Sequence, residues 1–313
     1  MTPFESNLSS TDTTSSSVFY ASLSARHRLD QVFAVVVWIA VLIALAVLTS
    51  LLLDVTIDGL PRLSWDFLTS LPSRNPEQAG ILSALVGSLW LLGLVVCIGL
   101  PIGIGAGIFL EEFAHRSFLI SLIEINIGNL AGVPSIIYGL LGLEMFVRLL
   151  ESITGGRAVL SGGLTLSLLI MPIVIVATRE ALRAVPSSIR EAEYALGAGR
   201  WQIVRELVLP QAFSGILTGS ILAMSRAIGE TASLITIGAL TFIAFLPPLS
   251  FEGLRTPFTA LPIQTFNWIS RPQQGFHTNA AAAVIVLMVV LLSMNATAIF
   301  LRDRFRRNQS PLT

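Results

Sequence analysis

Long uncharged apolar runs alternate with short polar stretches along most of the chain. A helix needs about 20 apolar residues to cross the hydrocarbon core of a membrane, which is about 30 Å thick. The runs near or above this length are residues 31–53, 81–110, 125–143, 162–178, 210–245 and 280–301. The pattern therefore predicts an all-α, polytopic membrane protein with six transmembrane helices.

Prolines and glycines interrupt the second and third runs. Small residues let membrane helices approach closely, and a kink at Pro101 is equally compatible with the pattern. The glycines around Pro101 are Gly99, Gly103, Gly105 and Gly107. In the third run, Gly132, Pro134 and Gly139 predict a broken or kinked helix. Such a break either lines a transport pathway or is a packing kink without a ligand, and both readings stay open.

We expect one transmembrane domain, residues 30–307, between two tails. The first 25 residues are rich in serine and threonine and lack the basic start and apolar core of a signal peptide. We expect residues 1–29 to be a disordered cytoplasmic tail and residues 308–313 to be a short cytoplasmic tail. Trp65 and Phe67, which follow the first run, are expected to anchor the chain at the membrane interface.

The arginine distribution predicts the orientation of the chain in the membrane. If both termini are cytoplasmic, twelve arginines lie on the inner side and six lie in the outer loops, with Arg226 inside the membrane. An excess of basic residues marks the cytoplasmic side of membrane proteins. This topology also places residues 186–206, a charged interruption between the fourth and fifth runs, in the cytoplasm.

The composition narrows the function. Only 12% of residues are charged and the formal net charge is zero, which argues against a nucleic-acid-binding protein. All 19 basic residues are arginine, so the chain cannot carry a Walker A motif, which requires lysine. The single cysteine, Cys97, excludes disulfide and cysteine–metal frameworks within the chain. Because the sequence also lacks a catalytic triad, metal cluster or dinucleotide fingerprint, we expect no enzyme activity of its own.

Residues 186–206 have an amphipathic pattern. Apolar positions recur at helical spacing on both sides of Gly197 and Gly199, which predicts two short helices joined by a turn. This pattern alone also fits an ordinary solvated connector. A more specific motif resembles the EAA loop of ABC-importer permeases, which docks into a cleft of the ATP-binding subunit, and its residues are Glu191, Ala192, Gly197, Leu207, Leu209 and Pro210. We therefore expect residues 186–209 to be a coupling loop.

Four longer stretches narrow the resemblance. They are NLAGVPSIIYGLLGL (129–143), MPIVIVATREALRAVPSSIREAEYALGA (171–198), ILTGSILAMSRAIGET (216–231) and TALPIQTFNWISRPQ (259–273). Together they are similar to the A-type permease subunit of high-affinity phosphate ABC importers, and the last one favours the A-type over the C-type. The resemblance implies a MetI-like fold, inward transport of inorganic phosphate and a location in the bacterial inner membrane.

The same resemblance implies the partners. They are a second, C-type permease subunit, a dimer of ATPase subunits, a periplasmic phosphate-binding protein and membrane lipid. ATP and Mg are expected on the ATPase, with no cofactor in this chain and no nucleic acid.

Arg226 and Glu230 are charged positions in an otherwise apolar run. Residues four apart on a helix share a face and can form an ion pair. Arg226 lies 16 residues beyond Pro210, roughly 24 Å along a helix, which places both charges deep in the membrane. An ionised side chain there costs about 2.5–3.5 kcal/mol by insertion scales, so it normally faces a cavity. The pair either fixes helix packing or guides the solute, with Arg226 binding the phosphate oxyanion and Glu230 holding Arg226 in place.

Three further residues are secondary candidates for the pathway. Arg179, at the inner end of the fourth run, is a cytoplasmic anchor, part of the phosphate route or part of an interdomain salt bridge. Ser225 and Thr231 are placed to donate hydroxyl groups near Arg226, although serines often serve helix packing.

Three other functions stay open. Within the same class, the solute is another oxyanion such as sulfate or molybdate. A secondary transporter or channel has similar spans and buried charges but does not need a docking loop. A membrane scaffold tolerates the loss of both charges at positions 226 and 230 without loss of flux.

The arginine asymmetry yields a first prediction. A reporter fused after Arg307 should be active in the cytoplasm, because the basic end of the last run stays on the inner side. Alkaline phosphatase and green fluorescent protein fusions at this position measure the orientation, and a periplasmic signal would refute the predicted topology.

Overall fold

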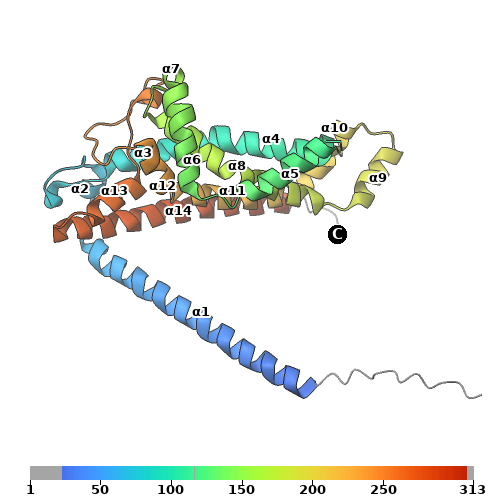
Figure 1. Ribbon diagram of the computed structural model, residues 1–313, viewed down its shortest axis with the longest axis horizontal. Coiled ribbons are helices and arrows are strands. Elements are labelled where there is room, and N and C mark those ends of the chain that lie inside the picture. Colours follow the sequence, from blue (N-terminus) through green and yellow to red (C-terminus); the bar gives the residue numbers. More distant parts are fainter. Residues whose placement is uncertain (1–22, 116, 309–313) are drawn as a thin grey trace, which may run out of the picture. The chain divides into compact units, whose positions relative to one another are not determined.

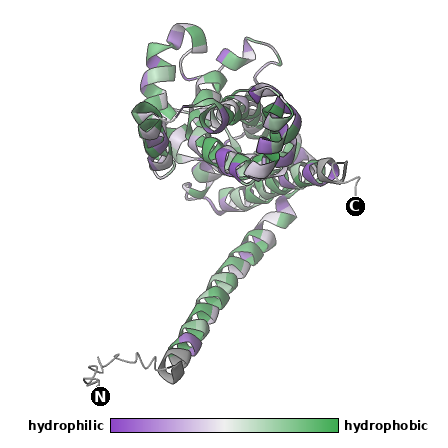
Figure 2. Ribbon diagram, turned by 90° about the vertical axis from the view of Figure 1, so that its right-hand side faces the viewer, coloured by the Kyte–Doolittle hydropathy of each residue, from purple (hydrophilic) through white to green (hydrophobic). Residues whose placement is uncertain are grey.

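The computed structural model describes residues 23–115 and 117–308, and these residues form helices and loops without a β-strand. It consists of two units, residues 1–53 and residues 54–313, which divide within helix α1 (Leu23–Gly59). The part of α1 in the first unit is apolar along most of its length, as Figure 2 shows. The predicted tails overlap little with the described residues: α1 already begins at Leu23, and residues 1–22 and 309–313 lie outside them.

The second unit is a helical assembly in which several spans are built from more than one helix. The π turns Val95–Gly99, Phe109–Phe113, Leu143–Leu149 and Val204–Val208 join or extend these helices. The helices are α2 (Trp65–Thr69), α3 (Leu82–Leu94), α4 (Leu100–Ile108), α5 (Phe118–Leu130), α6 (Ser135–Gly142), α7 (Glu151–Thr154), α8 (Val159–Arg183), α9 (Ser187–Ala195), α10 (Arg200–Ile203), α11 (Leu209–Ile228), α12 (Ala232–Ile237), α13 (Leu261–Ile269) and α14 (Gln274–Asn308).

Five helical stretches are long and apolar enough to cross a membrane. They are Leu29–Arg62, Leu82–Phe113, Val159–Arg183, Arg200–Ile228 and Gln274–Arg304. A sixth candidate consists of Phe118–Leu130 and Ser135–Leu149, which meet at an angle of 110°. The all-α prediction is confirmed, and each of the six apolar runs corresponds to one of these candidates.

The third run is a broken helix, as the sequence predicts. Residues 131–134 separate α5 from α6, and Pro134 lacks the backbone N–H that would continue the helical hydrogen bonds. The Tyr138 hydroxyl donates to the Leu130 carbonyl oxygen at 2.8 Å, which satisfies one acceptor freed by the break. Helical structure extends beyond the predicted run 125–143 on both sides, since Glu124 lies within α5 and Glu144 lies in the π-helix after α6.

Two other predictions are wrong in detail. The fifth span ends at Ile228, well before residue 245, and it begins at Arg200, so Pro210 lies inside a continuous helical stretch. The Val204–Val208 π turn directly precedes Pro210, where the missing N–H breaks the regular hydrogen-bond pattern. Phe67 is only 1% exposed and packs against Trp268 in the core, so it is not an interfacial anchor.

Helix α8 is the central element, and α4 and α11 pack on it at glycines (Figure 1). A Cβ built at Gly103 would lie 2.8 Å from the Val174 side chain, and one at Gly107 would lie 2.7 Å from Thr178. On α11, a Cβ at Gly219 would collide with the Cβ of Ala177. Gly105, by contrast, faces away and has nothing within 4 Å. Close backbone approach at small residues is therefore the packing device of this core.

This packing generates a second prediction. Gly219→Ala should lower the thermal midpoint of the purified chain, because overpacking a close helix contact costs about 1–3 kcal/mol. Gly105→Ala is the matched control, since its added methyl meets open space. Thermal unfolding of both variants in the same detergent checks this, and equal midpoints would contradict the packing assignment.

Candidate functional site

The docking segment, residues 186–203, contains α9 and α10, and α9 extends beyond the other helices of the second unit (Figure 1). Helices α9 and α10 are joined by a turn at Gly197, whose φ of +83° is a left-handed conformation that glycine adopts without strain. This confirms the prediction of two short helices around a turn. Tyr194, Leu196 and Trp201 expose 50%, 82% and 58% of their surfaces here. Large apolar side chains that are exposed close together are typical of a surface that contacts another protein.

The structure divides the six predicted docking residues into two groups. Glu191, Ala192 and Gly197 are exposed on the docking segment. Leu207, Leu209 and Pro210 are half-buried at the start of the fifth span, where both leucines pack against a cluster around Leu182 and Val208. These three residues hold the segment on the core, and the first three present its surface.

Arg226 lies in the last turn of α11, about midway along the neighbouring α8. The two helices are antiparallel, with Gly215 against Ala181 and Gly219 against Ala177. Continuing this register to the end of α11 places Arg226 level with Ile170. Its side chain is exposed, and within the described part of the chain it forms no hydrogen bond or ion pair. A guanidinium at this depth therefore lies on the chain's surface and is free for a ligand.

The predicted Arg226–Glu230 ion pair is not formed. Helix α11 ends at Ile228, so the two residues do not share a helix face. Glu230 instead accepts a hydrogen bond from the Ser233 backbone N–H at 3.2 Å, at the start of α12. The predicted ion pair requires a continuous helix through residue 230, and α11 ends two residues earlier.

Ser225 and Thr231 have local partners. The Ser225 hydroxyl lies 2.9 Å from both the Ile221 carbonyl oxygen and Asn295 Oδ1, so it links α11 to α14. The Thr231 hydroxyl lies 3.4 Å from the Gly229 carbonyl oxygen, in the break. This contact between two helices agrees with a role of Ser225 in helix packing.

The two broken spans meet beside Arg226. A Cβ at Gly139 of α6 would lie 2.8 Å from the Ser233 Cα of α12, so the two backbones are in close contact. The Arg226 guanidinium interacts electrostatically with the Tyr138 hydroxyl, which closes the break between α5 and α6. Non-helical backbone within a membrane domain lies where protein or water surrounds it, and here it gathers around the unpaired arginine.

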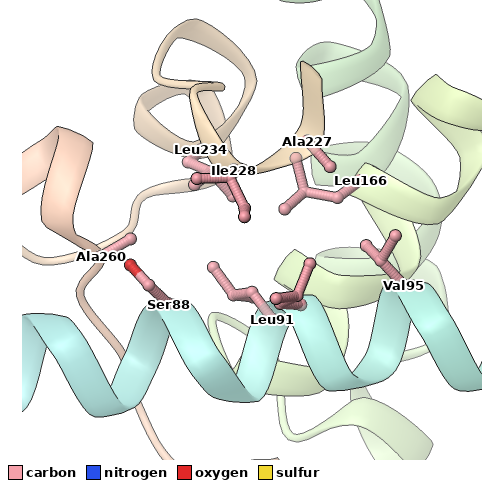
Figure 3. A pocket seen from close by; sticks show the side chains of 9 residues that line it. Ser88, Leu91, Val95, Leu166, Ala227, Ile228, Leu234 and Ala260 are labelled. Atoms are coloured by element: carbon pink, nitrogen blue, oxygen red, sulfur yellow. The ribbon is translucent and has the colours of Figure 1, made fainter. Parts of the chain in front are cut away.

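The interior behind Arg226 is closed. Ala227 and Ile228 line a small pocket with Leu91, Leu166 and other apolar side chains from α3, α8 and α12 (Figure 3). Its volume is about 10 Å³, roughly the space of one water molecule. This pocket is too small for a hydrated anion, whereas the Arg226 side chain lies on the exposed surface of the chain.

Arg179 lies near the C-terminal end of α8 in a network of ion pairs. It is 8% exposed, and its Nε and Nη2 atoms donate to Glu111 (3.1 Å) and Glu124 (2.7 Å). Arg183 also binds Glu111, at 2.9 Å. These residues line a cleft of about 720 Å³ between the π-helix Phe109–Phe113, α5 and α8. Because two carboxylates neutralise Arg179, its ion pairs join the second, third and fourth spans.

Sequence reasoning did not identify the carboxylates of this network. Glu111 and Glu124 lie just outside the predicted apolar runs 81–110 and 125–143, and their partners are 55 to 72 residues away in sequence. The spacing of Arg179 and Arg183, four residues apart on one helix face, was the available signal that both could reach one carboxylate.

The sequence matches a family model described as "Binding-protein-dependent transport system inner membrane component" over residues 99–309. The Haemophilus influenzae phosphate transport system permease protein PstA is 34% identical, over 82% of this chain and 88% of its own length. The Bacillus subtilis probable ABC transporter permease protein YqgI is 32% identical, over 80% and 88%. PstA 1 of Mycobacterium tuberculosis is 28% identical, over 94% and 95%.

Solved structures agree on the fold. A chain of a bacterial alginate ABC transporter, in complex with a periplasmic protein that carries an alginate pentasaccharide, superposes with a TM-score of 0.63 at 15% identity. The superposition covers 88% of this chain and 96% of the alginate transporter chain. A chain of the MetNI methionine ABC transporter in an inward-facing conformation has a TM-score of 0.56 at 18% identity and covers 71% and 96%.

Permeases of this family are membrane subunits that work with a separate ATPase and a binding protein, and they reside in the inner membrane. This membership removes the secondary-transporter, channel and scaffold readings. The chain belongs to the family of inner membrane components of binding-protein-dependent transport systems, as an ABC-importer permease homologous to the PstA phosphate permeases.

Proposed function

We propose that this chain carries inorganic phosphate inward across the membrane, together with a second phosphate permease subunit of the C-type. ATP and Mg bind to a pair of ATPase subunits, and a periplasmic phosphate-binding protein delivers the anion. The relatives named phosphate transport system permease proteins support the choice of solute. Both termini are proposed to be cytoplasmic.

The free guanidinium of Arg226 is the observation that carries the proposal. An uncompensated charge at mid-depth is costly unless it faces a cavity or an anion. Arginine presents parallel N–H donors that match two oxygen atoms of a phosphate. Because the core behind Arg226 is closed, we place the anion's route between this surface and the second permease, so that each subunit contributes one wall.

Glu230 does not hold Arg226 in place through an ion pair, and we propose that it acts on the anion instead. Its carboxylate lies half-buried in the break after α11, where it is bound to the Ser233 N–H. A negative charge near the route weakens anion binding, and transport requires a site that the solute can leave. A carboxylate also accepts a hydrogen bond from a protonated phosphate, which fully deprotonated sulfate cannot offer. This argument favours phosphate over sulfate as the solute.

The docking segment supplies the mechanical input. We propose that its exposed surface, with Glu191, Ala192 and Gly197, fits a cleft of the ATPase. Closure of the ATPase dimer then moves α9 and α10 and switches the spans between outward-facing and inward-facing states.

A third prediction tests Arg226. Arg226→Gln should reduce phosphate uptake by reconstituted complexes at least about 100-fold, because it removes a charge-assisted pair of hydrogen bonds worth roughly 1.5–3 kcal/mol each. The ATPase subunits should still co-purify. Radiolabelled phosphate uptake into proteoliposomes measures the effect, with sulfate as the control anion.

Arg74→Gln is the matched control, since Arg74 is exposed in the stretch between the first two spans. It removes the same charge from another place and should leave uptake unchanged. Normal uptake by the Arg226 variant would remove this residue from the pathway, and sulfate transport by the wild type would identify the rival solute.

A fourth prediction tests the docking turn. Gly197→Val should abolish phosphate-stimulated ATP hydrolysis while the chain stays inserted, because a β-branched residue at a φ of +83° is strained and reshapes the turn. Gly199→Ala is the control, since Gly199 has an ordinary φ of −73° and open space around it. ATPase assays of the assembled complexes compare the two variants. Wild-type stimulation in the Gly197 variant would refute the docking role of this turn.

A further inference from the structure

Arg190, on the docking helix α9, contacts the cytoplasmic ends of two spans. Its Nη2 atom donates to Glu112 Oε1 at 2.9 Å and to the Leu182 carbonyl oxygen at 2.7 Å. Glu112 lies in the π turn that ends the second span, and Leu182 lies in the last turn of α8. A single nitrogen atom therefore connects the docking helix to the second and fourth spans.

Burial makes this contact difficult to separate. The Glu112 side chain is 11% exposed and that of Arg190 is 23% exposed. The Nε atom of Arg190 is buried and has no hydrogen-bond partner among the described residues. Removing one member of this partly buried pair leaves the other charge without its partner, which costs more than losing a fully solvated pair. Glu112 and α9 are thus expected to move together.

The neighbouring residue makes a second contact with the docking segment. The Phe113 ring lies 5.5 Å from the Arg200 guanidinium carbon and 6.0 Å from the Trp201 ring, measured to its centroid. Both partners lie on α10, which continues through the π turn into α11. Each short helix of the docking segment therefore contacts one residue at the end of the second span.

The preceding residue extends these contacts to the other spans. Glu111 binds Arg179 and Arg183 of α8, and Arg179 in turn binds Glu124 of α5, the first half of the broken span. Residues 111–113, which we call the cytoplasmic junction, thus join the docking segment to the inner ends of the second, third and fourth spans.

We propose that the Arg190–Glu112 pair transmits the movement of the docking segment to the transmembrane spans. Arg190 and Glu112 are then positioning residues for coupled transport, distinct from the exposed residues that touch the ATPase. The proposal rests on the ATP-driven transport described above. With the pair intact, displacement of α9 moves the ends of the spans. Without it, α9 moves alone and ATP is hydrolysed without transport.

The test measures phosphate transported per ATP hydrolysed, in reconstituted complexes containing the full chain. Arg190→Gln, which removes both contacts, should lower this ratio by about tenfold, the scale of a typical coupling free energy. The ATPase should remain bound. Arg190→Lys, which keeps the charge, should recover a large part of the ratio, and Glu112→Gln should lower it even though its amide oxygen remains an acceptor.

Glu144→Gln is the matched control, because it breaks an exposed ion pair with Arg148 away from the junction. It should leave the ratio unchanged. An unchanged ratio in an assembled Arg190→Gln complex would overturn the proposal. Loss of the ATPase from that complex would also overturn it, because Arg190 would then be a docking residue.

Insertion is measured for each variant, and Glu112→Gln decides the matter if Arg190→Gln does not insert. An unchanged ratio in that variant overturns the proposal as well. If phosphate is not the solute, the result differs from failure of the coupling proposal. In that case the wild-type complex would couple ATP hydrolysis to another solute, and the same comparison of variants would be made with that solute.

Discussion

Close contact between helix backbones at α8 is the constraint on which the rest of the structure depends. Water does not drive helices together inside a membrane, so association relies on packing, and glycine permits the shortest approach. Glycines on α4 and α11 face α8, at Gly103 and Gly107 on one helix and at Gly219 on the other. This arrangement places the second and fifth spans beside the fourth, and with them the cytoplasmic junction and Arg226.

The charged groups of the chain are distributed according to what surrounds them. Arg179 is buried and Arg190 is partly buried, and each has a carboxylate partner. At mid-depth, Arg226 has none within the described residues and lies exposed beside two helix breaks. Paired charges hold elements together, whereas an unpaired one is available to a ligand. The contrast separates the paired arginines from Arg226, the residue that we propose binds the solute.

The docking segment and the region around Arg226 are connected through the transmembrane spans. The docking segment touches the end of the second span, and α10 continues into α11, which ends next to Arg226. Helix α8 runs beside both, from the ion-pair network past the level of Arg226. Helices α8 and α11 therefore connect the region of the ion pairs with the region around Arg226.

The sequence by itself determined the all-α class, the positions of the apolar runs, the break near Pro134 and the two helices of the docking segment. These features depend on local composition and periodicity. A lipid environment restricts both, because a spanning segment must be apolar and helical. Tertiary structure decided the end of α11 at Ile228, the burial of Phe67 and the partners of Arg179 and Glu230. Those outcomes depend on contacts between residues far apart in sequence, and an apolar run does not reveal which of its faces another helix covers or where its backbone leaves the helix.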